Sequence, residues 1–516
     1  MKAMRKIPAL LLALVILLGT LSGCASLSRP LPYLKKSVYA AVKESLPGQL
    51  LTSVVGATDK GSIALDFGGT DLVEGLPQAA ALKVWLSDGG HKIAADGALT
   101  VNDTVYDGRF WMTDGVAVAS SAAFFGSTTL GVDFNTLRRD LETSIFANNS
   151  GTDYARPDVS AAGTADAAID FKNGVFDLLA SLEGTPDLAE RALEVFLAKL
   201  ADNAELTAYR ENGRYIVSLS VDNAALSRTL RDTHAKLTKS RGFCNALRKR
   251  AAILDDLRAA RDGVVTNEYS TKLEYFLTGK SDIEELCAKV DGLAPFKIDL
   301  NATVRTLGRT LEKLRVAYTV ENERRMEAAV VLAGGGEPNI FTLTVNGVTR
   351  TLTYQTNIDT FRSYSASLLY QKRVEGETLL SVSGTLAADR RDKGYTLTLT
   401  QTGETRAFTG RYDFGKKVFS LSVDGCTVNG EARKLSLSLS IAKSEAMPEI
   451  PTYSNFVNLD AARYAPIDER MSAAKESFNA ARESVKLTPY QALSDLLTVL
   501  GLEAEIPPPP SEGEET

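Results

Sequence analysis

Short segments with alternating apolar and polar residues follow the N-terminal region of the chain. The segments that show this period-two pattern are residues 62–67, 81–87, 91–101, 104–112 and 116–120. Because successive side chains of a strand point to opposite faces of a sheet, this pattern predicts strands with one apolar face. Gly89-Gly90 and Asn102-Asp103 are residues that tolerate the backbone conformations of tight turns. We therefore expect an antiparallel meander with short connections.

A second alternating region runs from residue 297 to residue 441. Leu435, Leu437, Leu439 and Ile441 alternate with Ser436, Ser438 and Ser440, and Tyr395, Leu397 and Leu399 alternate with Thr396, Thr398 and Thr400. This pattern predicts a sheet with one apolar face and one hydroxyl-rich face. Tight turns are expected at Asn346-Gly347, Asp424-Gly425 and Asn429-Gly430.

Apolar residues three and four positions apart predict helices between and after the two β regions. The expected helices cover residues 33–46, 135–147, 165–182, 188–200, 222–261, 281–290, 467–485 and 489–500. Pro47-Gly48 is expected to end the first helix, and Gly242 to break the long segment 222–261. Asp222 or Asn223 can cap the start of that segment.

The order of elements predicts the fold class. Sheet, helices, sheet and helices follow one another, with an additional hairpin expected around Asn212-Gly213. This order indicates an α+β fold in which antiparallel, curved β-sheets, built from meanders and hairpins, alternate with helical segments. Whether the two β regions are related lobes stays open, because no strong sequence repeat links them.

The first 24 residues carry a targeting pattern. Basic residues precede an apolar run of ten residues, 9–18, and the quartet Leu21-Ser22-Gly23-Cys24 follows. The run is too short for a transmembrane helix, and this order of regions is typical of a signal peptide.

Leu21-Ser22-Gly23-Cys24 resembles the lipobox of bacterial lipoproteins, which signal peptidase II processes. The resemblance implies that Leu21, Ser22 and Gly23 are recognised by the peptidase. It also implies that the Cys24 thiol receives a diacylglycerol and that Cys24 becomes the new N-terminus. Because two or three acyl chains hold a protein stably on a bilayer, the chain is expected on the extracytoplasmic face of the cell membrane. The alternative is an ordinary cleaved signal peptide with an incidental cysteine, and Ala25 leaves the choice between inner and outer membrane open.

These patterns suggest a division of the chain. The expected parts are a signal peptide (1–23), a first lobe of β-sheet plus helices (24–265), a second β-rich lobe (266–458), C-terminal helices (459–502) and a disordered, acidic, proline-rich tail (503–516). At the level of fold alone, the arrangement resembles the half-barrel lipoprotein carriers of the LolA and LppX families. In those families a curved antiparallel sheet wraps a helix and leaves an apolar cavity.

Composition narrows the function classes. The 516-residue chain has a formal net charge of −6 and 44% hydrophobic residues, which is ordinary globular composition. The acidity gives no reason to expect nucleic acid as a partner. With only His91 and His234, a histidine-based metal site or a Ser-His-Asp triad is not expected. We therefore expect no cofactor, no metal and no catalytic residue.

Three cysteines remain if Cys24 carries lipid: Cys244, Cys287 and Cys426. An odd number permits at most one disulfide within the chain, so no disulfide framework is expected. The three residues can be small buried hydrophobic residues, or Cys244 and Cys287 can form a bridge.

A basic cluster lies in the segment 236–250. Its members are Lys236, Lys239, Arg241, Arg248, Lys249 and Arg250. They can contact anionic lipid headgroups, or they can form the solvated face of a helix.

Aromatic residues gather along the first β region. Trp85, Phe110, Trp111, Phe124 and Phe125 are candidates for lining a ligand cavity, and the alternative is that they belong to the core. The amphipathic sheets that alternate with helices, together with the absence of catalytic motifs, favour a non-catalytic, membrane-anchored lipoprotein that binds an apolar or lipid-like ligand between sheet and helices. The alternatives are a structural or interaction protein of the cell envelope, with an envelope protein as partner, and an Asp/Glu-dependent envelope hydrolase.

Overall fold

The computed structural model describes residues 46–485, except for 73–74, 157–159, 183–184, 263, 307–309, 334–336 and 359–362. Several predicted features lie outside the described residues: the expected signal peptide, the lipobox-like quartet with Cys24, residues 33–45 of the first expected helix, the helix expected at 489–500 and the tail expected at 503–516.

The first β region forms the meander that its alternation predicts. Its strands are β1 (Gly61–Thr70), β2 (Ala79–Ser87), β3 (Lys92–Val101), β4 (Thr104–Met112), β5 (Val116–Ser120) and β6 (Thr129–Asp133). Asn102 and Asp103 have φ angles of 49° and 61°, as the turn between β3 and β4 requires. β6 was not expected from the sequence.

The remaining strands follow the long helical region and the hairpin around Asn212-Gly213. They are β7 (Glu205–Glu211), β8 (Arg214–Asp222), β9 (Phe296–Arg305), β10 (Leu311–Val320), β11 (Glu323–Val331), β12 (Asn339–Val345), β13 (Val348–Ile358), β14 (Ser363–Val374), β15 (Glu377–Asp389), β16 (Gly394–Gln401), β17 (Glu404–Phe414), β18 (Val418–Val423), β19 (Gly425–Val428), β20 (Glu431–Arg433), β21 (Leu435–Ala442) and β22 (Ser454–Asn455). The turns at Asn346-Gly347 and Asn429-Gly430 are confirmed by the positive φ angles of all four residues.

The tight turn expected at Asp424-Gly425 is wrong. β17 pairs with β18 on one side of this dipeptide and with β19 on the other, and the register shifts by one residue between the two pairings. The dipeptide is therefore a bulge in one continuous strand direction. The backbone N–H of Asp424 donates to the carbonyl of Thr409 at 2.8 Å, so the strand keeps its partner through the bulge.

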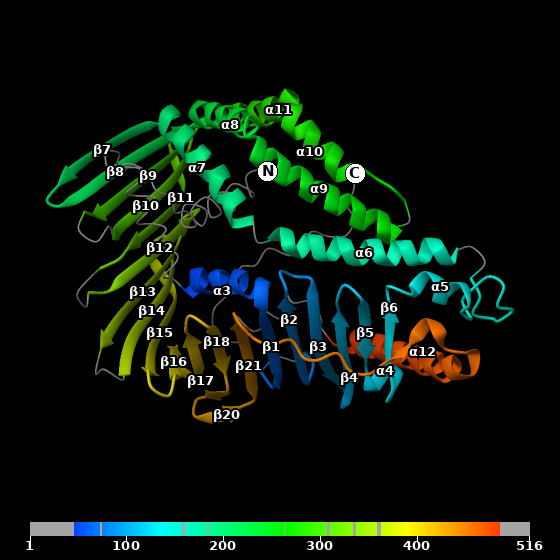
Figure 1. The fold of residues 1–516 in the computed structure, drawn as a ribbon. Helices are drawn as coiled ribbons and strands as arrows, with labels where there is room; N and C mark the ends of the chain where they lie inside the picture. Colours follow the sequence, from blue (N-terminus) through cyan, green and yellow to red (C-terminus); the bar gives the residue numbers. More distant parts are fainter. Residues whose placement is uncertain are drawn as a thin grey trace.

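All strands belong to one curved sheet (Figure 1). Neighbouring strands pair in chain order from β7 to β17. β17 then pairs with both β18 and β19, β18 pairs with β21, and β19 pairs with β20. β21 pairs with β1, and the sheet continues from β1 to β6. These pairings are antiparallel, and β22 adds a short parallel pairing to β6. Strands of the two predicted lobes therefore pair with each other in three places, at β8–β9, at β21–β1 and at β22–β6.

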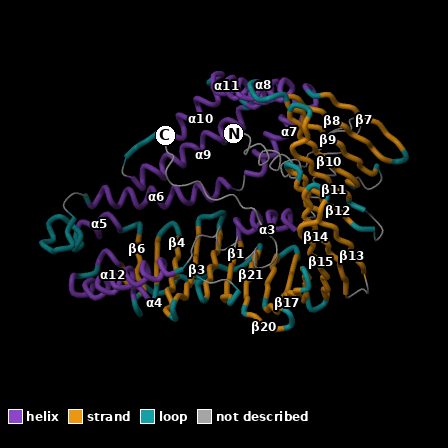
Figure 2. Tube along the Cα trace, turned by 180° about the vertical axis from the view of Figure 1, so that it is seen from behind, coloured by secondary structure: helices purple, strands orange, loops and turns teal. Residues whose placement is uncertain are grey.

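Helices form a second arm of the molecule and also cover parts of the sheet (Figure 1). They are α3 (Leu46–Lys60), α4 (Ala122–Phe125), α5 (Leu137–Glu142), α6 (Ala161–Leu182), α7 (Thr185–Asn203), α8 (Asn223–Leu237), α9 (Arg241–Asp262), α10 (Glu268–Thr278), α11 (Lys280–Asp291) and α12 (Ala461–Ser484), with the short 3-10 helix η2 at Phe456–Asn458. In Figures 1 and 2, α6, α9 and α10 run across the open side of the curved sheet. Within the described residues, no helix is both long and apolar enough to cross a membrane.

Several helix boundaries differ from the expected ones. Pro47-Gly48 does not end a helix, because α3 begins at Leu46 and the proline lies in its first turn, where a missing N–H is tolerated. The helix expected at 135–147 is shortened to α5, and the one expected at 467–485 begins earlier, at Ala461. The segment 222–261 forms a pair of helices, but the break lies at residues 238–240 and not at Gly242, which is in the first turn of α9. The Asp222 side chain caps α8 by accepting from the N–H of Ala225 at 2.7 Å. α4 and α10 were not expected.

The largest core cluster lies where α8 and α11 meet the sheet. Val217, Leu300, Val304 and Val316 are almost fully buried there, and Leu226 of α8 packs against them. At the turn between β2 and β3, Gly90 lies so close to α6 that a Cβ would come within 2.8 Å of the Leu179 Cβ. These contacts join the helices to the sheet at two places.

Candidate functional site

The two faces of the sheet differ strongly over strands β21, β1, β2, β3 and β4. The register aligns Ser62, Trp85, Ala94, Trp111 and Val118 in one row across β1–β5. Side chains at the alternate positions point to the opposite side. We call the side with Trp85 the strap face and the opposite side the apolar face.

Part of the strap face is covered by the chain itself. After β21 an extended segment, residues 443–453, crosses this face and leads to β22 at the edge of the sheet (Figure 1). We call this segment the strap. Its residues Met447, Ile450 and Tyr453 pack against the cluster that contains Trp111, which is 6% exposed. Trp85 and Trp111 are therefore part of a closed interior layer.

Glu445 attaches the strap to the sheet. Its carboxylate accepts hydrogen bonds from Lys83 Nζ at 2.6 Å, from Trp85 Nε1 at 3.2 Å and from the Ser62 hydroxyl. Burial disfavours the charged form, but the hydrogen bonds from Lys83, Ser62 and Trp85 outweigh it, so the pKa of Glu445 lies below its ordinary value. The carboxylate has a structural role in holding the strap.

The apolar face carries no charged side chain from β21 to β4. Its positions hold Leu435, Leu437, Leu439 and Ile441 of β21, Ile63, Leu65 and Phe67 of β1, Ala80, Leu82, Val84 and Leu86 of β2, Ile93, Ala95, Gly97, Leu99 and Val101 of β3, and Thr104, Tyr106, Gly108, Phe110 and Met112 of β4. Three helices cover parts of this face. α3 packs on Ile63 and Ile441, and α12 with α4 packs on Val101 and Tyr106.

Between these covered parts, the apolar face is open. Leu65, Leu82, Phe110 and Leu437 are 47%, 48%, 38% and 42% exposed. Leu65 lies directly beside Leu82, and the row continues from Leu82 to Gly97 and Gly108. We call these four exposed residues, with the two glycines, the open apolar patch.

The two glycines lower the floor of the open apolar patch. A Cβ at Gly108 would meet no atom within 4 Å, and a Cβ at Gly97 would lie in ordinary contact with Leu82. Neither glycine has a positive φ angle. The backbone does not require glycine at either position, and the missing side chains leave a shallow depression between Leu82 and Phe110. A contiguous apolar patch of this kind is typical of a surface that contacts an apolar partner.

The structure separates the five aromatic residues that the sequence suggested as ligand-lining. Trp85 and Trp111 lie under the strap, whereas Phe110 belongs to the open apolar patch. Phe124 packs beside Val101, Tyr106 and Phe478, and Phe125 packs against the cluster of Leu130 and Tyr464. Only Phe110 of the five contributes to the open apolar patch.

Among the described residues, the carboxylates with the lowest exposure serve as structural acceptors. Asp255 accepts from the backbone N–H groups of Tyr269 and Ser270 at 2.9 Å and 2.8 Å, and so caps α10. Burial opposes the charged form of Asp255, but hydrogen bonds from Ser270 and Tyr269 keep its pKa below the ordinary value. Asp140 is 4% exposed and joins α5 to the segment after the strap.

The other chemically notable residues have ordinary surroundings. His91 lies 3.7 Å from a carboxylate oxygen of Asp114, and His234 Nε2 contacts the carbonyl of Phe276 at 2.7 Å. No group of three possible metal ligands occurs in the described part of the chain. Cys244, Cys287 and Cys426 are buried free thiols.

The basic cluster at 236–250 is partly neutralised. Arg248 forms an ion pair with Glu274 of α10, and Arg250 donates to the carbonyl of Ser181. These contacts tie α9 to α10 and α6.

The open apolar patch had a signal in the sequence. Large apolar residues of the segments 62–67 and 435–441 alternate with small or polar residues, and their shared face follows once β21 is known to pair with β1. Sequence patterns alone did not place these two segments side by side, because they lie about 370 positions apart in the chain.

Comparisons with known proteins do not add a family. No protein-family model matches this chain, and no curated protein matches its sequence.

Proposed function

We propose that this protein is a lipoprotein anchored through Cys24 on the extracytoplasmic face of a bacterial membrane, and that it binds an apolar or lipid-like ligand without catalysing a reaction. The open apolar patch is the observation that carries the binding part of the proposal. The likeness of Leu21-Ser22-Gly23-Cys24 to a lipobox carries the anchoring part.

The shape of the apolar face suits a chain-like hydrocarbon ligand. Five neighbouring strands, β21 to β4, present apolar positions over a width of about 19 Å, taking a strand spacing of about 4.8 Å. A hydrocarbon chain makes no directional contacts, and the apolar face offers it none apart from the hydroxyls of Thr104 and Tyr106 at its edge. Burial of the exposed parts of Leu65 and Leu82 under such a ligand would remove apolar surface from water, at roughly 25 cal/mol per Å².

A photoreactive fatty acid tests this proposal in membranes that contain the protein. A long-chain fatty acid with a diazirine group is added, irradiated and located on the chain by mass spectrometry. We expect crosslinks in β1, β2 and β4 around Leu65, Leu82 and Phe110. Leu82→Gln should reduce them about tenfold, since the amide disfavours burial of hydrocarbon.

Leu379→Gln provides a matched control, because Leu379 is 63% exposed on β15, away from the apolar face. This variant should crosslink as the unaltered protein does. Crosslinks that avoid strands β21 to β4, or that are unchanged in Leu82→Gln, would rule out the open apolar patch as the binding site.

A specific observation also favours the second candidate, a structural or interaction protein of the envelope. On the face of β12–β17 opposite the apolar side chains, hydroxyl residues stand beside one another across strands, as in Thr385 beside Thr398 and Thr344 beside Thr349. The Thr344 and Thr349 hydroxyls are 3.0 Å apart. If this face binds an envelope protein, crosslinking in cells should recover one partner repeatedly, and Thr385→Lys with Thr398→Lys should abolish its recovery.

A further inference from the structure

A pocket lies at the edge of the sheet, and none of its lining residues belongs to the open apolar patch. It has a volume of about 700 Å³ and is formed by the turn after α4, the segment 454–459 and the first half of α12. Its apolar lining comes from Phe125, Leu459, Pro466 and Ile467. Leu459 and Ile467 are themselves buried in the core cluster below it, so this wall is anchored.

Two arginines from one helix line the same pocket. Arg463 and Arg470 are seven residues apart on α12, which places them on the same side of the helix about 10 Å apart along its axis. Ser127, Thr128 and Ser454 add hydroxyl groups, which can donate hydrogen bonds. Donors of this kind around an apolar wall are what an amphiphilic anion needs.

Gly126 makes room for one of these guanidinium groups. A Cβ at this position would come within 2.4 Å of Arg470 Nη1, and the residue has a φ of +65°. Only glycine adopts this conformation readily, and only glycine lets the arginine lie so close to the backbone. The turn after α4 and the Arg470 side chain therefore fit each other.

The positive charge of Arg470 is uncompensated locally. Within the described part of the chain, Arg470 has no ion pair and no hydrogen bond. Arg463 lies 3.6 Å from Asp460, and both side chains of that pair are largely exposed, so their attraction is weak. Both arginines can thus engage an external anion without breaking a strong internal contact.

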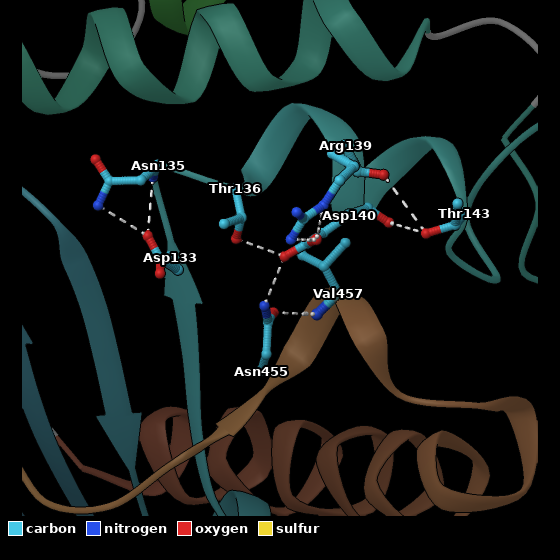
Figure 3. Close-up of polar contacts among 8 residues, drawn as sticks. All are labelled: Asp133, Asn135, Thr136, Arg139, Asp140, Thr143, Asn455 and Val457. Carbon is cyan, nitrogen blue, oxygen red and sulfur yellow. Dashed lines mark hydrogen bonds and ion pairs between the residues drawn. The ribbon is translucent and has the colours of Figure 1, made fainter.

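One wall of the pocket, at Asn455, is held in place by the buried carboxylate of Asp140 (Figure 3). Asn455 lines the pocket, and its side-chain amide donates to Asp140 at 2.9 Å while its carbonyl oxygen accepts from the N–H of Val457 at 3.1 Å. Asp140 also accepts from the Thr136 hydroxyl at 2.6 Å. The wall is therefore fixed before any ligand arrives, which lowers the entropic cost of binding.

We propose that this pocket binds a small organic anion, whose carboxylate or phosphate group contacts Arg470 and Arg463 and whose apolar part packs on Phe125 and Pro466. The inference is independent of the proposed function, because it needs neither the lipid anchor nor the open apolar patch. Carboxylate and phosphate share the negatively charged oxygens that guanidinium groups recognise.

The test is isothermal titration of the purified full-length protein with benzoate, phenyl phosphate and inorganic phosphate. We expect benzoate or phenyl phosphate to bind more tightly than inorganic phosphate, since only the aromatic probes contact Phe125. Arg470→Met should weaken that binding at least about tenfold, and the better probe identifies the anionic group. Methionine retains part of the apolar stem of arginine, and circular dichroism checks that the variant is folded.

Arg482→Met is the matched control, because Arg482 is an exposed arginine of the same helix that does not line the pocket. This variant should bind the probe as the unaltered protein does. The proposal is overturned if neither aromatic probe binds at millimolar concentration, or if folded Arg470→Met binds as tightly as Arg482→Met.

Discussion

The ring of Tyr453 rests on the bare backbone of Gly131. A Cβ at Gly131 would lie 2.3 Å from Cδ2 of Tyr453, closer than any side chain can approach. Gly131 pairs with Asn455, so the same short stretch of chain both covers this glycine and adds β22 to the sheet edge. The contact lies at the end of the strap, where the chain turns past β6 toward α12. By pairing with β6, β22 also covers an edge of the sheet that would otherwise be unpaired.

Gly131→Ala tests how firmly this end of the strap is seated. The added methyl group must displace the Tyr453 ring, and overpacking of this kind costs about 1–3 kcal/mol of the free energy of unfolding. The decrease should be visible as a lower midpoint in urea denaturation. An unchanged midpoint would mean that the strap moves aside at no cost.

Tyr453→Ala supplies the control for that experiment. Alone, it should destabilise the protein, because the cluster of Trp111 and Val118 loses part of its cover. In the Tyr453→Ala background, however, Gly131→Ala should have little further effect, since the clashing ring is gone. Additive losses in the double variant would contradict a direct contact between the two residues.

Glu445 should be the main polar anchor of the strap. Glu445→Ala leaves the Trp85 N–H without its acceptor and removes the contact to Lys83, so we expect a loss of about 2 kcal/mol in the free energy of unfolding. Glu445→Gln keeps an acceptor for Trp85 and should cost less. Lys83→Met removes the ion pair, whose side chains are 35% and 34% exposed, and the contact of the Lys83 ammonium with the face of the Trp85 ring at 4.7 Å, and should cost about 1 kcal/mol.

These three variants have a fixed expected order in urea denaturation. Glu445→Ala should have the lowest denaturation midpoint, and the midpoint of Lys83→Met should lie closest to that of the unaltered protein. If Lys83→Met were the most damaging of the three, the strap would depend on the ion pair and not on the hydrogen bond to Trp85.

Asp140 should make the free energy of unfolding depend on pH in the acidic range. The Thr136 hydrogen bond is the main reason that its pKa lies below the ordinary 3.8; burial opposes this, and Arg139 and Asn455 add to it. A carboxyl whose pKa is lower in the folded protein stabilises it fully above the unfolded value. That contribution is lost as the pH falls from about 3.8 through the lower folded pKa.

Asp140→Asn should remove this part of the pH dependence. The free energy of unfolding of the variant should lie below that of the unaltered protein at pH 7, and the difference should shrink between pH 4 and the acid limit of folding. Asp170→Asn is the control, because Asp170 is exposed on α6 and has no hydrogen-bond partner in the described part of the chain. A constant difference for Asp140→Asn at all pH values would contradict the lowered pKa.

Much of the sheet could be predicted from local pattern. Alternation located β1–β5, and Asn-Gly dipeptides located two of the later hairpins, because both signals depend on residues that are neighbours in sequence. Asp424-Gly425 failed as a turn because a bulge and a turn use similar residues, and only the pairing of β17 with both β18 and β19 separates them. α12 begins before Pro466 because its first turns pack on Leu130 and Ile145, contacts that no local pattern shows.

The candidate sites depended on long-range placement. Phe110 and Trp111 are consecutive in β4, so alternation alone puts them on opposite faces of the sheet. What the sequence could not show is which face the strap covers, since the strap follows β4 by more than 300 residues. The pocket beside Arg470 likewise combines the turn after α4 with α12, two segments that are far apart in the sequence and lie together only in the folded protein.

Cys24→Ser tests the anchor on which the proposed location depends. Serine has no thiolate to alkylate, so the variant should lack the diacylglycerol. Intact-mass measurement should find lipid on the N-terminal cysteine of the unaltered protein and none on the variant. In fractionated cells, the unaltered protein should sediment with membranes and be released by detergent. A signal peptide that is cleaved without lipid attachment would leave the Cys24 thiol free. An unmodified cysteine in the native protein would therefore contradict the proposed membrane anchor. The open apolar patch and the pocket beside Arg470 would then be features of a secreted protein.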